Sequence, residues 1–274
     1  MKYPPGPVKP KKHLGQHFLH DPSIALRIAE CIAAPLDHPM LEIGPGTGAL
    51  TQPMIALGRT SIEVVDVDIE SVQHLQHQNW VHEANVRIHH GDILKWPASQ
   101  WEIIANGRPF AIVGNFPYNI SSQILFRAFE LGDRISELTG MFQKEVAERI
   151  CAPPGNKTYG ILSVLMQAHF HCRYEFTVEE MAFHPPPKVK SGVIHCKRKT
   201  PDEIPSEPSA DHLRRVVKTA FNQRRKTLRN ALQSGGYDLS NVQDTMLSLR
   251  AEALSVEEFQ DLARKLPHQG TTRS

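Results

Sequence analysis

The stretch MLEIGPGTGAL, residues 40–50, decides the fold of this 274-residue chain. It is an apolar run that ends at Gly44, Gly46 and Gly48 and continues directly into a helix-forming stretch. Glycine is needed where the backbone turns sharply and approaches a ligand with no side chain between them. The pattern predicts a buried strand, a ligand-binding turn and a helix, which together are the first unit of a layered α/β domain.

Further apolar runs extend this pattern along the chain. Strands are predicted over residues 40–44, 61–66, 85–90, 109–115, 137–143, 172–178 and 191–197. Helices are predicted over residues 49–57, 69–78 and 121–129, and others are expected to begin near Lys144 and Tyr159. Runs that are apolar nearly throughout are typical of strands buried on both faces. The alternation predicts a Rossmann-like, doubly wound α/β sheet.

The character of the sequence changes after residue 199. TPDEIPSEPS, residues 200–209, contains three prolines and three acidic residues, a composition typical of a linker. Beyond it the apolar residues follow helical spacing, Gly235 and Gly236 predict a helix end, and Ser255 with Glu258 predicts a capping box. We expect an α/β catalytic domain over residues 1–199 and a small all-helical domain over residues 209–268.

The composition is that of an ordinary globular protein, with 40% hydrophobic and 22% charged residues. No apolar run approaches the roughly 18 residues that a membrane-spanning helix needs. The first residues carry prolines and lysines where a signal peptide would need an apolar segment. The four cysteines form no CxxC pair, and the histidines form no HExxH or paired Cys–His spacing, so no metal site is predicted. We expect a cytoplasmic protein that does not contact a membrane.

Positive charge is concentrated in the helical part. Residues 211–233 hold seven basic residues against one acid, a net charge of +6, which leaves −4 for the remainder of a chain whose total is +2. Arg224, Arg225, Lys226 and Arg229 are expected on two turns of helix, with no acid close enough in sequence to pair with them. Such a patch predicts a surface that binds RNA phosphates, and a solvated helix face is the alternative.

Acidic residues near the glycine turn outline a nucleotide-type pocket. Asp66 ends the next strand, twenty residues beyond Gly46, at the spacing of an acid that binds ribose hydroxyls. NAD and S-adenosylmethionine both fit this geometry. Pro45 removes an N–H that a pyrophosphate would use, and the Glu42 carboxylate suits a cation, so S-adenosylmethionine is favoured. Asp92, just past a third strand, is placed to accept from the adenine amino group, with a cap or turn role as the alternative.

The segment NFPYNIS, residues 115–121, stands at the carboxyl end of the fourth predicted strand, where α/β sheets bind ligands. The lone pair of an adenine N6 is delocalised into the ring, so an enzyme can activate it by accepting both N6 hydrogens. The Asn115 side-chain oxygen and the Phe116 carbonyl supply two acceptors. Pro117 stiffens the loop, and Tyr118 offers a face on which an extruded base can stack. Most of the acceleration is then expected from positioning.

Taken together, these motifs resemble the small-subunit (16S) ribosomal RNA adenine N6,N6-dimethyltransferases. The resemblance covers nearly the whole chain and rests on HLGQHFLHD (13–21), LEIGPGTGALT (41–51), NFPYNIS (115–121), FQKEVAERI (142–150), TYGILSVLMQ (158–167), FHPPPKVKSGV (183–193) and AFNQRRKTLRNAL (220–232). The last motif distinguishes this family from the large-subunit rRNA methylases, which share the earlier ones. The resemblance implies S-adenosylmethionine-dependent dimethylation of two adjacent adenines in the 3'-terminal hairpin of 16S rRNA, within a pre-30S particle late in assembly. We expect the protein to act as a monomer.

The family's cofactor contacts fall by position on a set of six residues in this chain. They are His17, Leu19, Gly44, Asp66, Asp92 and Asn115. This chain departs from the commonest pattern at His17, where many members have Asn, at Asp66, where Glu is more frequent, and at Phe116, which replaces Leu. None of these changes removes a required chemical function.

Three other functions use some of the same features. A non-catalytic assembly factor would use the cofactor fold only to dock on the pre-ribosome, but the intact pocket and the NFPY motif argue against docking alone. A large-subunit rRNA methylase shares the earlier motifs. A DNA adenine methylase would usually carry a sequence-reading domain, and only a small basic helical module is present here.

Overall fold

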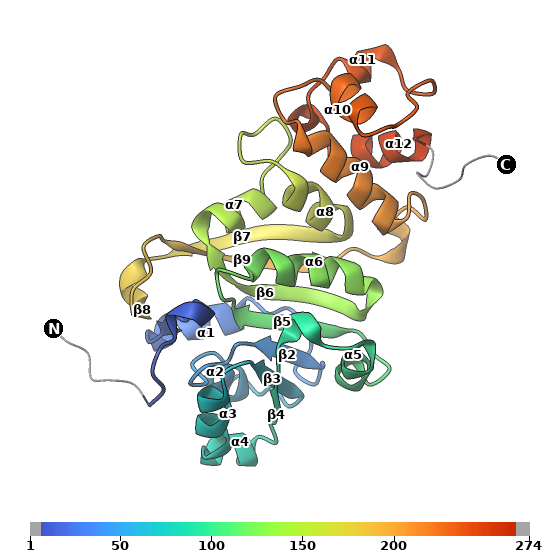
Figure 1. The fold of residues 1–274 in the computed structure, drawn as a ribbon. Helices are drawn as coiled ribbons and strands as arrows, with labels where there is room; N and C mark the ends of the chain where they lie inside the picture. The colour runs from blue at the N-terminus through green and yellow to red at the C-terminus, as the bar shows by residue number, and fades with distance from the viewer. Residues whose placement is uncertain (1–6, 267–274) are drawn as a thin grey trace. The chain divides into compact units, whose positions relative to one another are not determined.

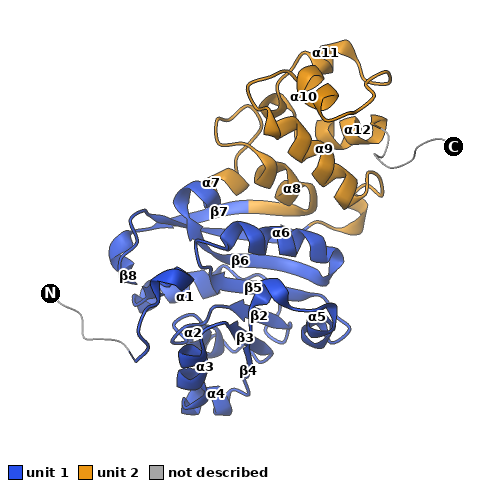
Figure 2. Ribbon diagram, in the orientation of Figure 1, with its two compact units in different colours: residues 1–147, 173–198 blue, residues 148–172, 199–274 orange. Residues whose placement is uncertain are grey.

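The computed structural model describes residues 7–266 and divides into two compact units (Figure 2). Unit 1 comprises Met1–Ala147 and Arg173–Arg198, and unit 2 comprises Glu148–Cys172 and Lys199–Ser274. Unit 2 thus takes in residues 148–172, which the sequence placed with the α/β domain, because these residues pack among the C-terminal helices. Residues 267 and 268 of the predicted helical domain lie outside the described residues.

Unit 1 is built on a seven-stranded sheet with the order β4-β3-β2-β5-β6-β9-β7 (Figure 1). The strands are β2 (Met40–Ile43), β3 (Ile62–Asp66), β4 (Arg87–His90), β5 (Phe110–Asn115), β6 (Ile135–Gln143), β7 (Phe170–Val178) and β9 (Ser191–Arg198). The first five in this spatial order pair in parallel, and β9 is antiparallel to β6. All seven predicted strands are confirmed.

Helices cover both faces of this sheet, which confirms the doubly wound class. They are α1 (Pro22–Glu30), α2 (Thr51–Ala56), α3 (Ile69–Gln76), α4 (Asn79–Glu83), α5 (Ala98–Ala105) and α6 (Ser121–Leu131). Met40 and Val64 join one core cluster with apolar residues of α1, α2 and α3. Ala111 of β5 belongs to the same cluster, so the side chain of Phe110, the residue before it, points to the opposite face of the sheet. There it stacks against Trp101 of α5, with ring centroids 6.1 Å apart.

The strand order reverses between β3 and β5, which flank β2 on its two sides. In sheets of this kind, ligands bind outside the carboxyl ends of the strands at such a point. A second, two-stranded sheet lies beside this edge, where β1 (Phe18–Leu19) pairs antiparallel with β8 (Phe183–His184). The pairing brings the N-terminal part of the chain next to the loop that precedes β9.

Unit 2 is helical. It contains α8 (Ile161–His169), α9 (Ala210–Asn222), α10 (Leu228–Ser234), α11 (Asp244–Leu247) and α12 (Val256–Lys265), and α7 (Lys144–Ile150) ends in it. The ring centroid of Phe221 in α9 lies 6.2 Å from that of Tyr159, just before α8, and 5.7 Å from that of Phe259 in α12. The predicted capping box is confirmed, since Ser255 Oγ accepts from the N–H of Glu258 and the Glu258 carboxylate accepts from the N–H of Ser255.

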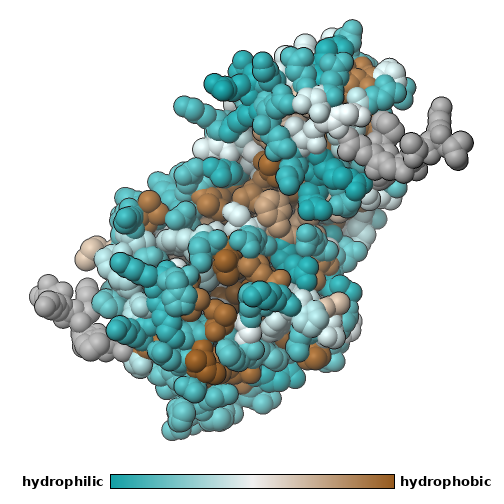
Figure 3. Space-filling model, in the orientation of Figure 1, coloured by the Kyte–Doolittle hydropathy of each residue, from teal (hydrophilic) through white to brown (hydrophobic). Residues whose placement is uncertain are grey.

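Most of the face drawn in Figure 3 is hydrophilic, and hydrophobic side chains show between the polar ones over unit 1. Across residues 7–266, every helix is too short or too polar to cross a membrane. Within the same residues, no group of three or more His, Cys, Asp or Glu side chains is placed to hold a metal ion.

Candidate active site

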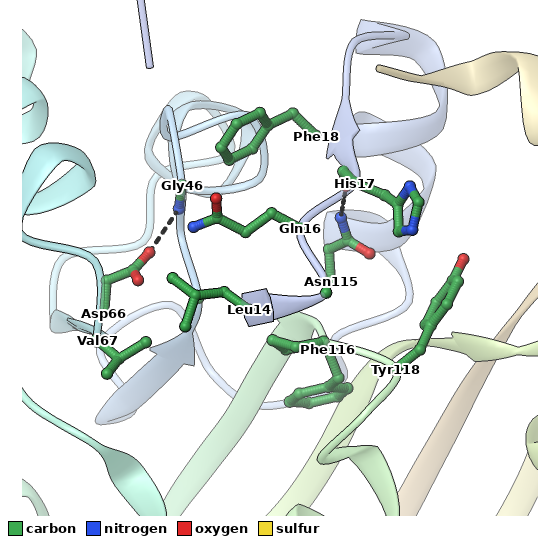
Figure 4. Close-up of a pocket in the computed structure, with 13 residues that line it drawn as sticks. Leu14, Gln16, His17, Phe18, Gly46, Asp66, Val67, Asn115, Phe116 and Tyr118 are labelled. Carbon is green, nitrogen blue, oxygen red and sulfur yellow. Dashed lines mark hydrogen bonds between the residues drawn. The ribbon is translucent and has the colours of Figure 1, made fainter. Parts of the chain in front are cut away.

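A cavity opens at the carboxyl ends of β2, β3 and β5, where the strand order reverses (Figure 4). The space between the lining residues is about 480 Å³, counting the part that is open to solvent. Segments far apart in the sequence line it: Leu14, Gly15, Gln16, His17, Phe18, Gly44, Gly46, Asp66, Val67, Asn115, Phe116, Pro117 and Tyr118. The structure therefore brings most of the predicted site residues together.

The glycine turn after β2 has the geometry that the sequence predicts. Gly44, Gly46 and Gly48 have φ angles of +71°, +57° and +85°, in the region that favours glycine. A Cβ atom on Gly46 would lie 2.8 Å from the Phe18 ring, so any larger residue at position 46 would force the Phe18 ring away from the turn. The absence of a side chain at Gly46 therefore lets the Phe18 ring pack directly against the turn.

Asp66 ends β3 and is buried at the edge of the cavity. Its carboxylate accepts from the N–H of Gly46 at 3.2 Å and from the N–H of Asp68 at 2.8 Å. Burial raises the pKa of this carboxyl above its ordinary value, and the hydrogen bonds from the backbone oppose that effect. A carboxylate oxygen has two lone pairs, so Asp66 can hold the glycine turn and still accept from ribose hydroxyls.

Glu42 lies beneath the glycine turn and lines an adjoining, smaller cavity with an empty volume of about 350 Å³. Leu19, Gly44 and Asn115 line the same space, so Asn115 faces both cavities. The Thr51 hydroxyl donates to the Glu42 carboxylate at 2.6 Å. Burial raises the pKa of Glu42 to about 7. A cation placed in this cavity would favour the ionised carboxylate.

The Asn115 amide has a defined orientation at the end of β5. Its Nδ2 donates to the main-chain carbonyl of His17 at 2.9 Å. A carbonyl can only accept, so the nitrogen must face it and Oδ1 points away from it. In Figure 4 this oxygen lies on the side where Tyr118 stands. The structure therefore leaves the amide oxygen available as an acceptor, as the predicted chemistry requires.

Phe116 fixes the loop that follows Asn115. Its ring is buried and lies 4.8 Å from the Phe142 ring, and its N–H donates to the carbonyl of Met141 on β6. The ring occupies space left by two glycines, since a Cβ on Gly140 would lie 2.4 Å from it and one on Gly114 would lie 3.0 Å from it. The missing side chains explain how this chain accommodates a phenylalanine here.

Tyr118 stands at the end of the cavity opposite Asp66 (Figure 4). Its hydroxyl and that of Ser191 on β9 are 2.5 Å apart, which fixes the far end of the ring. Burial raises the pKa of the Tyr118 hydroxyl, so it stays protonated. The His17 imidazole stacks on the tyrosine, with ring centroids 5.5 Å apart and 28° between the planes.

Sequence reasoning missed the contacts that hold residues 11–19, which we call the N-terminal segment, against the cavity. Lys11 Nζ lies 2.5 Å from Asp68 and 3.1 Å from Glu70, and Gln16 donates to Asp68 at 2.9 Å. Burial alone would raise the pKa of Asp68, but the bonds from Lys11 and Gln16 outweigh burial and lower it. The ionised Asp68 thus anchors the segment beside Asp66.

Asp92 lies outside both cavities. It precedes a 3-10 helix at Ile93–Lys95, accepts from the N–H of Leu94 at 3.0 Å and lies 3.4 Å from Lys95. These contacts are those of a helix cap, the alternative that the sequence left open. The carboxylate has further lone pairs, so a contact with a cofactor stays a prediction.

The four basic residues predicted to bind RNA lie in unit 2, three of them between α9 and α10 and the fourth within α10. They are Arg224, Arg225, Lys226 and Arg229. The prediction that all four lie on two turns of helix is wrong, because α9 ends at Asn222 and the first three residues form a turn. The side chains of Arg225 and Lys226 are exposed and make no hydrogen bond or ion pair with the described residues.

Two members of this basic cluster nevertheless have acidic partners that are distant in sequence. Arg224 Nε donates to the Glu252 carboxylate at 3.0 Å, and Arg229 donates to Asp244 at 2.5 Å. Both acids lie well beyond helical i,i+4 spacing, at separations of 28 and 15 residues. A count of acids close in sequence could not find them.

Comparisons with known proteins agree over nearly the whole chain. The family model described as ribosomal RNA adenine dimethylase matches residues 8–266. A protein of Bacteroides fragilis named ribosomal RNA small subunit methyltransferase A is 48% identical over 260 residues, covering 94% of this chain and 93% of its own. A protein of the same name from Flavobacterium johnsoniae is 48% identical over 263 residues, covering 96% of this chain and 98% of its own.

Two solved structures share the fold. A dimethyladenosine transferase of Plasmodium falciparum superposes with a TM-score of 0.74 at 22% identity, covering 91% of this chain and 98% of its own. The 23S rRNA methyltransferase ErmE superposes with a TM-score of 0.68 at 23% identity, covering 91% of this chain and 99% of its own. Both likenesses support the Rossmann-like class and the added C-terminal helices.

Proposed function

Because the chain belongs to the ribosomal RNA adenine dimethylase family, we propose that it transfers methyl groups from S-adenosylmethionine to adenine N6 atoms of small-subunit rRNA. The chain is thus an rRNA adenine dimethyltransferase, and the substrate follows from relatives that are 47–48% identical over more than nine-tenths of this chain. We further propose that the methylated bases are the two adjacent adenines of the 3'-terminal hairpin of 16S rRNA. The single observation that carries the proposal is the oriented Asn115 amide.

The residues around the glycine turn fit S-adenosylmethionine. Asp66 closes one end of the cavity with a buried carboxylate that suits ribose hydroxyls, and Glu42 supplies a second carboxylate for a cationic group. When bound, S-adenosylmethionine supplies an electrophilic methyl group on its sulfonium. Leu19, Gly44 and the main chain of His17 lie where they would contact the methionine part, and Asp92 would have to reach the adenine from outside the cavity.

The acceptor side of the reaction depends on the loop after β5. Asn115 Oδ1 and the Phe116 carbonyl accept the two N6 hydrogens, which localises the nitrogen lone pair toward the methyl carbon. Tyr118 supports the extruded base by stacking, and Pro117 limits the freedom of the loop. No basic side chain with an adjusted pKa is needed, because N6 becomes acidic only as the methyl group arrives and its proton can then pass to water. Positioning therefore carries most of the rate increase.

We assign RNA contacts to the exposed cations of unit 2, with Arg225 and Lys226 the most available for phosphates. Arg224 and Arg229 can contribute only by sharing or exchanging their carboxylate partners. The corresponding assignment is catalysis by unit 1 and RNA binding by unit 2, in which residues 148–172 join the predicted RNA-binding part over residues 209–268. We further propose that the protein acts as a monomer in the cytoplasm, on a pre-30S particle.

The proposal is tested with methyl-tritiated S-adenosylmethionine and purified undermethylated small subunits, large-subunit RNA or duplex DNA. Label should be retained on the small subunits alone. Asn115→Ala should lower the transfer rate by about 10²–10³-fold, as expected for a hydrogen bond made in the transition state. Asn79→Ala, the same change at an exposed position of α4, is the matched control and should leave the rate unchanged. Full activity in Asn115→Ala would refute the assignment of this strand end.

A further inference from the structure

The His17 side chain is part of the site, but the reaction described above uses only its main chain. Its imidazole lies at the Tyr118 end of the cavity, whereas Asp66 lies at the other end, with Asn115 between them (Figure 4). The ring thus faces the place of the substrate base and points away from the ribose end of the cofactor pocket.

The imidazole occupies one face of Tyr118. The two rings are 5.5 Å apart at their centroids and only 28° from parallel. A base sandwiched between two rings needs a separation of about 7 Å, twice the roughly 3.5 Å between stacked carbon atoms. An adenine therefore cannot stack on this face of Tyr118 while the imidazole is present.

Two separate contacts hold His17, and only one of them involves the ring. Nδ1 lies 2.7 Å from the carbonyl oxygen of Pro185, in the loop after β8. The main-chain carbonyl of His17 independently accepts from Asn115, and the following residues pair with β8. Rotation of the side chain would break the first contact and leave the second intact. The ring can therefore move without disturbing the catalytic amide.

We propose that the His17 imidazole is a gate on the base-binding face of Tyr118, which the target adenine must displace before methyl transfer. This proposal rests on the proposed function and adds a specificity-determining residue to it. An adenine held by many contacts elsewhere in structured RNA can displace the ring. The cost of displacing the ring is the same for every adenine, but it lowers kcat/KM in full only where base insertion limits the rate. We expect insertion to limit the rate for an unstructured strand and RNA binding to limit it for the small subunit, so the gate selects against the unstructured strand.

The gate is tested by comparing two substrates in the tritium-transfer assay: small ribosomal subunits and a short unstructured adenine-containing RNA. His17→Ala should raise kcat/KM for the unstructured RNA by about 2- to 10-fold, the range that an aromatic pair is worth. The gain for small subunits should be smaller. His17→Asn, which also removes the ring, should show the same change. His13→Ala, an exposed histidine in the same segment, is the matched control and should behave as the unsubstituted protein.

The other outcomes overturn the proposal in different ways. A fall in kcat/KM for both RNAs would mean that the imidazole is a fixed wall of the base slot. A rise confined to the KM for S-adenosylmethionine would mean that the side chain contacts the cofactor. If neither variant changes the ratio of the kcat/KM values for the two RNAs, the ring does not select the substrate.

A second measurement separates the gate from the proposed function. In the RNA-free protein, an NMR cross-peak is expected between ring protons of His17 and Tyr118, and it should vanish when a hairpin with the small-subunit 3'-terminal sequence is added to saturation. Persistence of the cross-peak in the RNA-bound state overturns the gate, even if transfer is normal. Absence of transfer to small subunits by the unsubstituted protein would instead refute the proposed function, whatever the cross-peak shows.

Discussion

Replacing Glu42 by glutamine changes one ionisable group in an almost fully enclosed position. The side chain is 1% exposed beneath the glycine turn, and its carboxylate accepts from Thr51 at 2.6 Å. Burial raises its pKa from the ordinary value of 4.5 to about 7. Glutamine has nearly the same shape and can still accept from Thr51, so the substitution removes the charge and little else.

The sign and size of the effect follow from proton binding. The folded state binds the Glu42 proton more tightly than the unfolded state, whose carboxyl titrates near 4.5. The contribution of this group to the free energy of unfolding is therefore highest below pH 4.5, decreases between pH 4.5 and about 7, and is level above that. At about 1.4 kcal/mol for each tenfold difference in proton affinity, the whole decrease is about 3 kcal/mol.

Urea unfolding of both proteins from pH 4.5 to 8 measures this difference. Glu42→Gln should match the unsubstituted protein at the acidic end and exceed it by up to about 3 kcal/mol at pH 8. Glu30→Gln, at the exposed end of α1, is the control and should show no such trend. A difference between Glu42→Gln and the unsubstituted protein that stays constant across the pH range would refute the raised pKa.

The remaining predictions concern the cofactor, the RNA and the loop after β5. In the unsubstituted protein, calorimetry should find that S-adenosylmethionine binds more tightly as the pH rises through about 7, where the buried carboxylate becomes ionised, and the glutamine variant should lose this dependence. Arg225→Glu with Lys226→Glu should lower the salt slope of RNA binding by about 2 and leave cofactor affinity unchanged, with Arg225→Lys and Lys226→Arg as the control. Gly140→Ala should lower the free energy of unfolding by about 3 kcal/mol in urea, because its Cβ would lie 2.3 Å from the Gly114 carbonyl oxygen. Asp68→Asn keeps a side chain that can cap α3 but removes the ion pair that anchors the N-terminal segment, so calorimetry should find cofactor affinity about 10-fold lower with little change in stability.

The sheet could be predicted from the sequence because its signal is local. Strands β2, β3 and β5 are short, mostly apolar runs that end at or just before a glycine, an acid or an asparagine, and helix-length stretches separate them. Once the strands are known, the rule that ligands bind at their carboxyl ends places Gly44, Asp66 and Asn115 at one edge. The cavity lined by these three residues confirms that geometric expectation.

The contacts that complete the site could not be predicted in this way because they join distant parts of the chain. Lys11 and Asp68 are 57 residues apart, and His17 and Pro185 are 168 residues apart. Such pairs depend on how β1 meets β8, and a two-residue strand has too little pattern to detect. The role of Asp92 could not be predicted for a different reason: an acid that caps a turn and an acid that binds a ligand look alike in sequence.

The N-terminal segment connects the two ends of the cavity. At one end Lys11 and Gln16 bind Asp68, whose N–H in turn donates to Asp66. At the other end the carbonyl of His17 orients the Asn115 amide. Because one segment makes both sets of contacts, we predict that a ligand that holds it at one end also favours the arrangement at the other end. Such coupling is reciprocal, so RNA must strengthen cofactor binding by the same factor by which the cofactor strengthens RNA binding.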